Sequence, residues 1–93
     1  MRTIERSSEF KRDYQRESKG QHRATLKARL TSVLTTLVSD QILDARHRDH
    51  SLSGAWAGYR ECHIKPDLLL IYRKLGSDTL RLARLGSHNE LFG

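Results

Sequence analysis

Apolar residues recur with helical spacing in the stretch from residue 26 to residue 38. One wide face of a helix there would carry six of them: Leu26, Leu30, Val33, Leu34, Leu37 and Val38. A narrower apolar seam precedes it, because Phe10 and Tyr14 lie four residues apart between the serines at 7–8 and Lys19-Gly20. Serine before a helix and glycine after it are typical boundary residues. The pattern therefore predicts two antiparallel helices joined near Gly20-Gln21.

Strand patterns flank this helix pair. Residues 3–6 alternate polar and apolar side chains and predict a first, edge-like strand, whereas the polar stretch 39–54 predicts a loop. Residues 59–64 alternate again, residues 68–72 form a continuous apolar run, and residues 79–85 form a last strand. Turns at Pro66 and at residues 76–78 separate these strands. Such short connections favour consecutive antiparallel pairing.

The predicted order is therefore β-α-α-β-β-β, which belongs to the α+β class. We expect residues 1–93 to form one domain, in which two antiparallel helices pack on one face of a small, twisted, mainly antiparallel sheet. The other face of the sheet would remain free to bind a ligand. A chain of 93 residues can bury one modest core.

The charge of the chain is strongly basic, and it is unevenly distributed. The formal net charge is +6 at pH 7. Residues 1–48 carry eleven Lys and Arg against six Asp and Glu, whereas residues 49–93 carry six against five. This balance favours a polyanionic partner such as nucleic acid. It also suggests that the basic first half docks the protein and that the second half carries chemistry.

A single cysteine, Cys62, excludes an intramolecular disulfide and a cysteine-based metal cluster. A lone thiol fits the reducing cytoplasm. The chain has neither the ~20 consecutive apolar residues that a membrane-spanning helix needs nor a signal sequence. No histidine pair has the spacing of a zinc site. We therefore expect a cytoplasmic protein that needs no membrane, metal or cofactor.

Several groups suited to proton transfer lie where the predicted strands end or turn. His50, His63, Asp67 and His88 have this placement, and a folded sheet can gather them at one edge. Imidazoles exchange protons near neutral pH, and an adjacent carboxylate can orient the ring. Arginine matches the geometry of phosphate. Such a set can cleave RNA without metal, by activating a ribose 2′-OH against the neighbouring phosphate.

The same residues also have interpretations that involve no catalysis. A histidine on a small basic protein is usually a surface or capping residue. Trp56, Tyr59 and Tyr72 have the character of packing residues. Arg81 and Arg84 are three apart, so on a regular strand they face opposite ways and only one would serve a site, unless a bulge intervenes. The residue pattern alone thus leaves both an enzyme and a binding module open.

A longer motif resembles a known family. Residues 49–63, which read DHSLSGAWAGYRECH, resemble the DHxLxGxWxGYRxxH signature of YafQ-type toxins in the RelE/ParE superfamily. The likeness continues through Pro66-Asp67, residues 70–72 and 80–81, Arg84, residues 86–88 and residues 91–93. It covers essentially the whole chain, most strongly over residues 49–93. The predicted element order also agrees with a RelE-like fold.

The resemblance implies a ribosome-dependent endoribonuclease. Family members cut mRNA in the ribosomal A site without metal, and they leave a 2′,3′-cyclic phosphate and a 5′-hydroxyl. A cognate antitoxin of the DinJ/RelB type would hold the enzyme inactive. The hetero-oligomeric complex would bind operator DNA through the antitoxin.

The resemblance also assigns roles to individual residues. Those matching the catalytic positions are His50, His63, Asp67, Arg84 and His88. Those expected to contact substrate are Phe92, Arg81 and Leu68. Those expected to bind ribosomal RNA are Lys11, Arg12, Arg16, Lys19, Arg23 and Lys27. We assign proton transfer to His50 and His88, and orientation with nucleobase or 2′-OH contacts to His63 and Asp67. Leu68 stands where the best-known member has tryptophan, so we expect codon preference to differ.

Two other functions compete with the enzyme. A non-catalytic, ParE-like inhibitor of DNA gyrase would have no need of the His/Asp cluster. A basic RNA-binding module would have no antitoxin encoded beside it.

Overall fold

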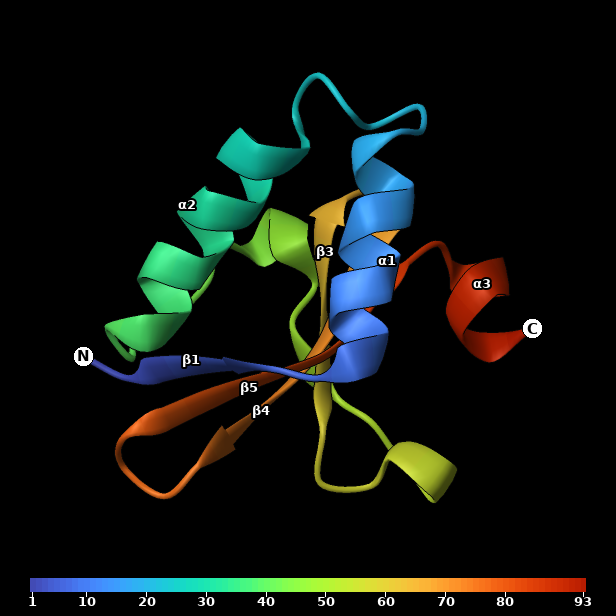
Figure 1. The fold of residues 1–93 in the computed structure, drawn as a ribbon. Coiled ribbons are helices and arrows are strands. Elements are labelled where there is room, and N and C mark those ends of the chain that lie inside the picture. Colours follow the sequence, from blue (N-terminus) through green and yellow to red (C-terminus); the bar gives the residue numbers. More distant parts are fainter.

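The computed structural model describes residues 1–93 and contains three helices and five strands. In chain order they are β1 (Thr3–Arg6), α1 (Ser8–Ser18), α2 (Leu26–Val38), β2 (His50–Ser51), β3 (Arg60–Lys65), β4 (Leu68–Leu75), β5 (Thr79–Gly86) and α3 (His88–Phe92). Two short 3-10 turns cover Ala45–His47 and Gly54–Trp56. The helices α1 and α2 lie on one side of the sheet, and α3 ends the chain beside it (Figure 1). The predicted α+β fold is confirmed.

The five strands form one mixed sheet in the order β1-β5-β4-β3-β2. The strands β3, β4 and β5 pair antiparallel in sequence, as their short connections predicted. The strand β1 pairs parallel with β5, and along the chain α1 and α2 separate β1 from the other four strands. The first strand is therefore an edge strand, as expected.

The two long helices begin and end close to where the sequence indicated. The hydroxyl of Ser7 accepts the backbone N–H of Phe10 and caps α1. The same hydroxyl donates to the carbonyl of Ala83 at 2.7 Å, which ties the start of α1 to β5. Phe10 and the apolar face of α2 are buried against the sheet.

The main core lies between α1, α2 and the sheet, and β4 runs through its centre. Along β4, alternate side chains face opposite sides. Leu68, Leu70 and Tyr72 enter the helix-side core, whereas Leu69 and Ile71 face the other way. This alternation explains why the strand is a continuous apolar run.

The face of the sheet away from α1 and α2 is partly covered, which corrects the expectation that it would be free. A second, smaller cluster forms there around four buried residues, with three half-buried ones packed on them: Leu69, Ile71, Ala83 and Leu91, then Leu52, Trp56 and Tyr59. The segment after β2 and the helix α3 supply this cover. Two pockets remain on this face, and they define the site described below.

Two elements were missed by the sequence reading. The strand β2 lies within the expected loop and is only two residues long, so no alternation reveals it. The helix α3 is five residues long and is held by a capping box, in which Ser87 and Glu90 bond each other's backbone N–H. No helix in the structure has the length and apolar character to cross a bilayer.

Candidate active site

A pocket of about 370 Å³ opens where β3, β4 and the start of α3 meet. We call it the histidine pocket. Eight residues line it: Glu61, His63, Pro66, Asp67, Leu69, Ser87, His88 and Asn89. The fold therefore brings together three of the residues expected to be catalytic, namely His63, Asp67 and His88. They come from a strand, a turn and a helix that are separated by up to 25 residues of sequence.

The buried carboxylate of Glu61 joins His50 to this pocket. The strand β2 pairs with β3 so that His50 lies opposite Glu61. One carboxylate oxygen of Glu61 lies 3.7 Å from Nε2 of His50 and 3.8 Å from Nε2 of His63. The Glu61 side chain is only 8% exposed. His50 thus stands beside the pocket, and Glu61 connects the two imidazoles.

Backbone carbonyl oxygens hold the rings of His50 and His63 in the same way, each through its Nδ1 atom. Nδ1 of His50 lies 2.8 Å from the carbonyl oxygen of Arg48, and Nδ1 of His63 lies 3.2 Å from that of Pro66. A carbonyl oxygen only accepts, so each Nδ1 must carry the hydrogen. In the neutral rings both Nε2 atoms are then proton acceptors. Glu61 can pair with the positive charge that forms when either ring takes up a proton.

His88 also lines the pocket, and it is the first residue of α3. Its ring lies 5.1 Å from the ring of Phe92, which is one helical turn further on and 38% exposed. The buried side chain of Leu91 anchors α3 on the sheet. His88 is therefore an exposed imidazole on a short but fixed helix.

The carboxylate of Asp67 lines the pocket, but it does not orient His63 as expected. It is 60% exposed and lies 3.6 Å from Nε2 of His22, a buried residue in the connection between α1 and α2. The side-chain amide of Gln21 donates to it at 3.4 Å. His63 is held by Pro66 and faces Glu61 instead.

A second pocket, of about 340 Å³, lies on the same face and contains two aromatic rings. We call it the aromatic pocket. Its lining is Ser7, Glu9, Trp56, Tyr59, Arg81, Ala83 and Arg84. Between β4 and β5 the register shifts, since Ile71 pairs with Arg84 but Tyr72 pairs with Leu82. This bulge places Arg81 and Arg84 beside one pocket, which a regular strand would not allow.

Arg84 is held in place by a buried carboxylate from α1. Asp13 accepts Nε of Arg84 at 2.7 Å and Nη2 at 3.2 Å, and it also accepts the backbone N–H of Leu85 at 3.0 Å. Burial raises the pKa of Asp13, but these hydrogen bonds outweigh burial and leave that pKa below its ordinary value. Nη1 of Arg84 makes no hydrogen bond within the protein. Arg81, the other arginine, pairs with Glu5.

Two of the expected contact residues are placed differently. The side chain of Leu68 is completely buried in the helix-side core, so it cannot reach a bound codon. Its neighbour Leu69 faces the histidine pocket instead. Arg16 forms ion pairs with Asp13, Glu17 and Glu90, so it connects α1 to the C-terminal segment, and its side chain is 42% exposed.

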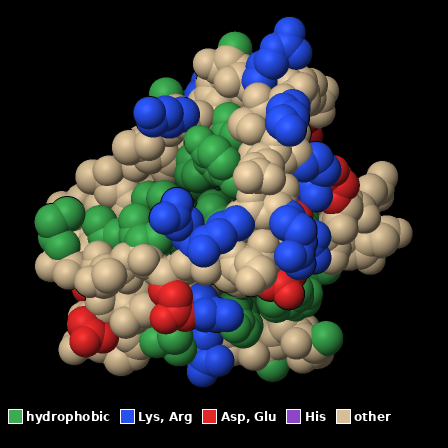
Figure 2. Space-filling model, in the orientation of Figure 1, with side chains coloured by type: hydrophobic (Ala, Val, Ile, Leu, Met, Phe, Trp, Pro, Cys, Tyr) green, Lys and Arg blue, Asp and Glu red, His purple; other side chains and the backbone are tan.

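The other basic residues that were expected to bind ribosomal RNA lie on α1, α2 and their connection, and they are exposed, as expected. They are Lys11, Arg12, Lys19, Arg23 and Lys27. Basic side chains run along α1 and onto the connection beyond it, and no histidine is visible on this face (Figure 2). These exposed basic residues and the histidine pocket therefore belong to different sides of the molecule.

The sequence reading missed Glu61, although a signal for it was present. Glu61 and His63 are two residues apart on a strand, so they share a face. The roles of Asp13 and His22 depend on contacts between distant segments, which no local pattern reveals. No group of three His, Cys, Asp or Glu side chains is placed to hold a metal ion.

Comparison with known proteins shows which family the chain belongs to. The profile of the family described as the bacterial toxin of type II toxin–antitoxin system, YafQ, matches residues 2–93. The chain therefore belongs to the YafQ family of bacterial toxins.

Individual relatives agree over their full length. The mRNA interferase toxin YafQ of Escherichia coli K12 is 39% identical over 92 residues, which are 97% of this chain and 99% of the relative. The crystal structure of YafQ from E. coli BL21(DE3) has a TM-score of 0.85 at 36% identity and covers all of both chains. YafQ in the E. coli DinJ–YafQ complex has a TM-score of 0.84 at 38% identity, again over both whole chains.

Proposed function

We propose that this protein is an endoribonuclease toxin that cuts mRNA at the ribosome and thereby inhibits translation. The observation that carries the proposal is the histidine pocket, which is lined by Glu61, His63 and His88 and has His50 beside Glu61. Family membership and the mRNA interferase activity named for the E. coli relative support the same conclusion.

The arrangement suits cleavage by internal attack of the ribose 2′-OH. The 2′-oxygen attacks the phosphorus while its proton passes to Nε2 of His50 or His63, where Glu61 balances the new charge. The bond from phosphorus to the 5′-oxygen breaks, and His88 gives a proton to that oxygen. The products are a 2′,3′-cyclic phosphate and a 5′-hydroxyl. Because the Nε2 atoms of His50 and His63 lie near Glu61, we assign the base to one of these two rings and the acid to His88.

Arg84 and the aromatic residues would hold the substrate. The free Nη1 of Arg84 can donate to a phosphate oxygen, while Asp13 keeps the guanidinium in place. Phe92 is exposed beside His88, and Trp56 packs edge-on against Tyr59 in the aromatic pocket. Aromatic rings that reach the surface, such as the exposed Phe92 and the half-buried Trp56 and Tyr59, can stack on bases with little sequence preference. We propose that they hold the nucleotides on either side of the scissile phosphate.

The exposed basic residues of α1, α2 and their connection would bind ribosomal RNA through its phosphates. This role excludes Arg16, whose charge is satisfied within the protein. Each lost phosphate contact should reduce the slope of log K against log salt by about 0.7 to 0.9. Arg12→Ala is therefore expected to weaken ribosome binding and its salt dependence together. An unchanged slope would argue against contact at this position.

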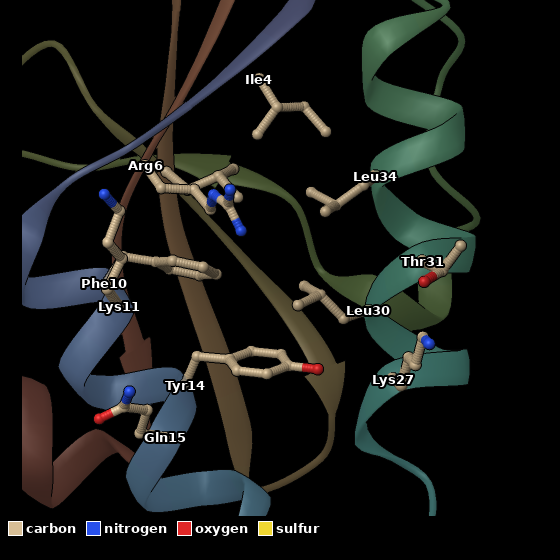
Figure 3. Close-up of a pocket in the computed structure, with 11 residues that line it drawn as sticks. Ile4, Arg6, Phe10, Lys11, Tyr14, Gln15, Lys27, Leu30, Thr31 and Leu34 are labelled. Atoms are coloured by element: carbon tan, nitrogen blue, oxygen red, sulfur yellow. The ribbon is translucent and has the colours of Figure 1, made fainter.

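A groove of about 540 Å³ between α1 and α2 offers a place for the antitoxin. Phe10 and Tyr14 project from α1 and Leu30 and Leu34 from α2 toward this groove (Figure 3). Lys11, Lys27 and Arg6 also line it. An apolar floor with a basic rim suits an amphipathic segment that carries acidic residues. The structure of the E. coli DinJ–YafQ complex supports an antitoxin partner for this family member as well.

The proposal is tested by sequencing mRNA 5′ ends after brief expression. We expect new ends at a fixed phase of the reading frame, because the ribosome would present the codon. The variant in which both His50 and His88 are alanine should be folded and should generate no new ends. An Asp78→Asn variant, at an exposed residue that lines none of the three pockets, serves as the control and should cut like the wild type.

Two results would overturn the proposal. One is toxicity of the double histidine variant equal to that of the wild type. The other is growth arrest that begins with DNA damage rather than with a stop in translation, since this would indicate gyrase inhibition.

A further inference from the structure

The carboxylate of Asp49, directly before His50, is anchored by two neighbouring strands. It accepts the hydroxyl of Tyr72 on β4 at 2.6 Å, and it accepts Nε and Nη2 of Arg60 on β3, both at 3.3 Å. Tyr72 is 1% exposed and belongs to the helix-side core. Asp49 therefore reaches back into the sheet at the point where the polar loop ends.

This anchor lies on the face of the sheet opposite to the histidine pocket. Tyr72 and Arg60 have the same parity on their strands as the residues that face the helices, whereas Glu61 faces the pocket. In extended backbone, successive side chains point to opposite faces. Fixing Asp49 on the helical side therefore directs His50 toward Glu61.

The backbone before Asp49 makes the link to the imidazole direct. Arg48 has a left-handed conformation, with φ 49° and ψ 44°, which a side chain other than glycine rarely adopts. Its carbonyl oxygen is the acceptor for Nδ1 of His50. That carbonyl belongs to the peptide between Arg48 and Asp49. The orientation of this peptide thus depends on where the Asp49 side chain is held.

We propose that Asp49 is a positioning residue for His50, and that Tyr72 and Arg60 act through it. The Asp49 anchor holds the carbonyl of Arg48 so that Nδ1 of His50 keeps its hydrogen and Nε2 faces Glu61. The consequence for catalysis rests on the proposed function, but the state of the imidazole does not. The two parts can therefore be tested separately.

The first test uses nitrogen NMR of the imidazole in the full chain, without RNA. In the wild type we expect His50 in one neutral form, with the hydrogen on Nδ1. Tyr72→Phe removes one hydroxyl and little else, so the protein should fold. In this variant the shifts of the two ring nitrogens should move toward the averaged values of an imidazole that exchanges between its two neutral tautomers. A Tyr14→Phe variant, whose hydroxyl forms no hydrogen bond within the protein, should leave His50 unchanged.

The second test is a kinetic cycle on RNA cleavage by folded protein. Asp49→Asn and Tyr72→Phe should each lower kcat about tenfold with little change in KM, since a misplacement of about 1 Å can cost about a hundredfold and these displacements should be smaller. In a His50→Gln background the same substitutions should have no further effect. Arg60→Lys should retain more activity than Arg60→Gln, because the charge next to Asp49 remains.

The outcomes separate this inference from the proposed function. An unchanged His50 spectrum in Tyr72→Phe and Asp49→Asn would overturn the positioning role, whatever the activity. An equal loss of kcat in the His50→Gln background would also overturn it, because Asp49 would then act elsewhere. A wild-type protein that cuts no RNA while His50 responds as described would contradict the proposed function alone.

Discussion

Among the acidic residues, Asp13 is the one whose replacement should lower the free energy of unfolding most. Its side chain is 4% exposed and accepts hydrogen bonds from Arg84, Leu85 and Arg16. Asp13→Asn would leave the guanidinium of Arg84, itself 25% exposed, without its counter-charge. Breaking a buried ion pair from one side costs about 3–5 kcal/mol. We expect the lower end, about 3 kcal/mol, because both arginines retain some contact with water.

The direction of the Asp13 pKa shift determines how the free energy of unfolding depends on pH. The pKa of Asp13 in the folded protein lies below 3.8, its ordinary value. Its ionised form therefore stabilises the fold at pH values above 3.8, and this stabilisation is lost as the pH falls through the folded pKa. Urea unfolding of wild type and Asp13→Asn should differ by about 3 kcal/mol at neutral pH. The difference should shrink below pH 3.8.

A matched control and a refuting result follow from the same contacts. Asp78 is exposed and forms no ion pair, so Asp78→Asn should change stability by less than about 0.5 kcal/mol. A loss below ~1 kcal/mol for Asp13→Asn, or one that persists unchanged in acid, would refute a buried charge anchor at this position.

Three other substitutions test separate parts of the structure. Glu61→Gln should lower kcat roughly tenfold to a hundredfold without unfolding the protein, because the charge beside two imidazoles is lost; steady-state cleavage kinetics measure this. Ser87→Ala should remove the cap of α3 at a cost of about 1 kcal/mol, seen as faster hydrogen exchange at Glu90 and reduced activity through His88. Leu68→Ala should cost about 2–5 kcal/mol in urea unfolding and leave the preferred codon unchanged, since its side chain lies in the core.

The elements with a long periodic pattern were predictable, and the short ones were not. The stripe from Leu26 to Val38 has enough turns to define a helix, and β4 has enough consecutive apolar residues to define a buried strand. The strand β2 and the helix α3 are too short for either pattern. For α3 the Ser87-x-x-Glu90 capping box was nevertheless readable in the sequence.

The candidate site was predictable as a list of residues but not as a set of contacts. His63 and His88 share a pocket because of how β3 and α3 meet, which depends on tertiary packing. The bulge that brings Arg81 beside Arg84 has no local signal in the sequence. Leu68 was misplaced because a position in a family motif does not state which face a strand residue occupies.

The chemistry at the ends of the cut RNA tests the central claim most directly. Purified protein, ribosomes and a defined mRNA would be combined, and the new termini would be identified by mass spectrometry. The histidine pocket predicts a 2′,3′-cyclic phosphate upstream and a 5′-hydroxyl downstream, both absent when His50 and His88 are replaced by alanine. A 5′-phosphate and 3′-hydroxyl, or the same cleavage by the double variant, would contradict it.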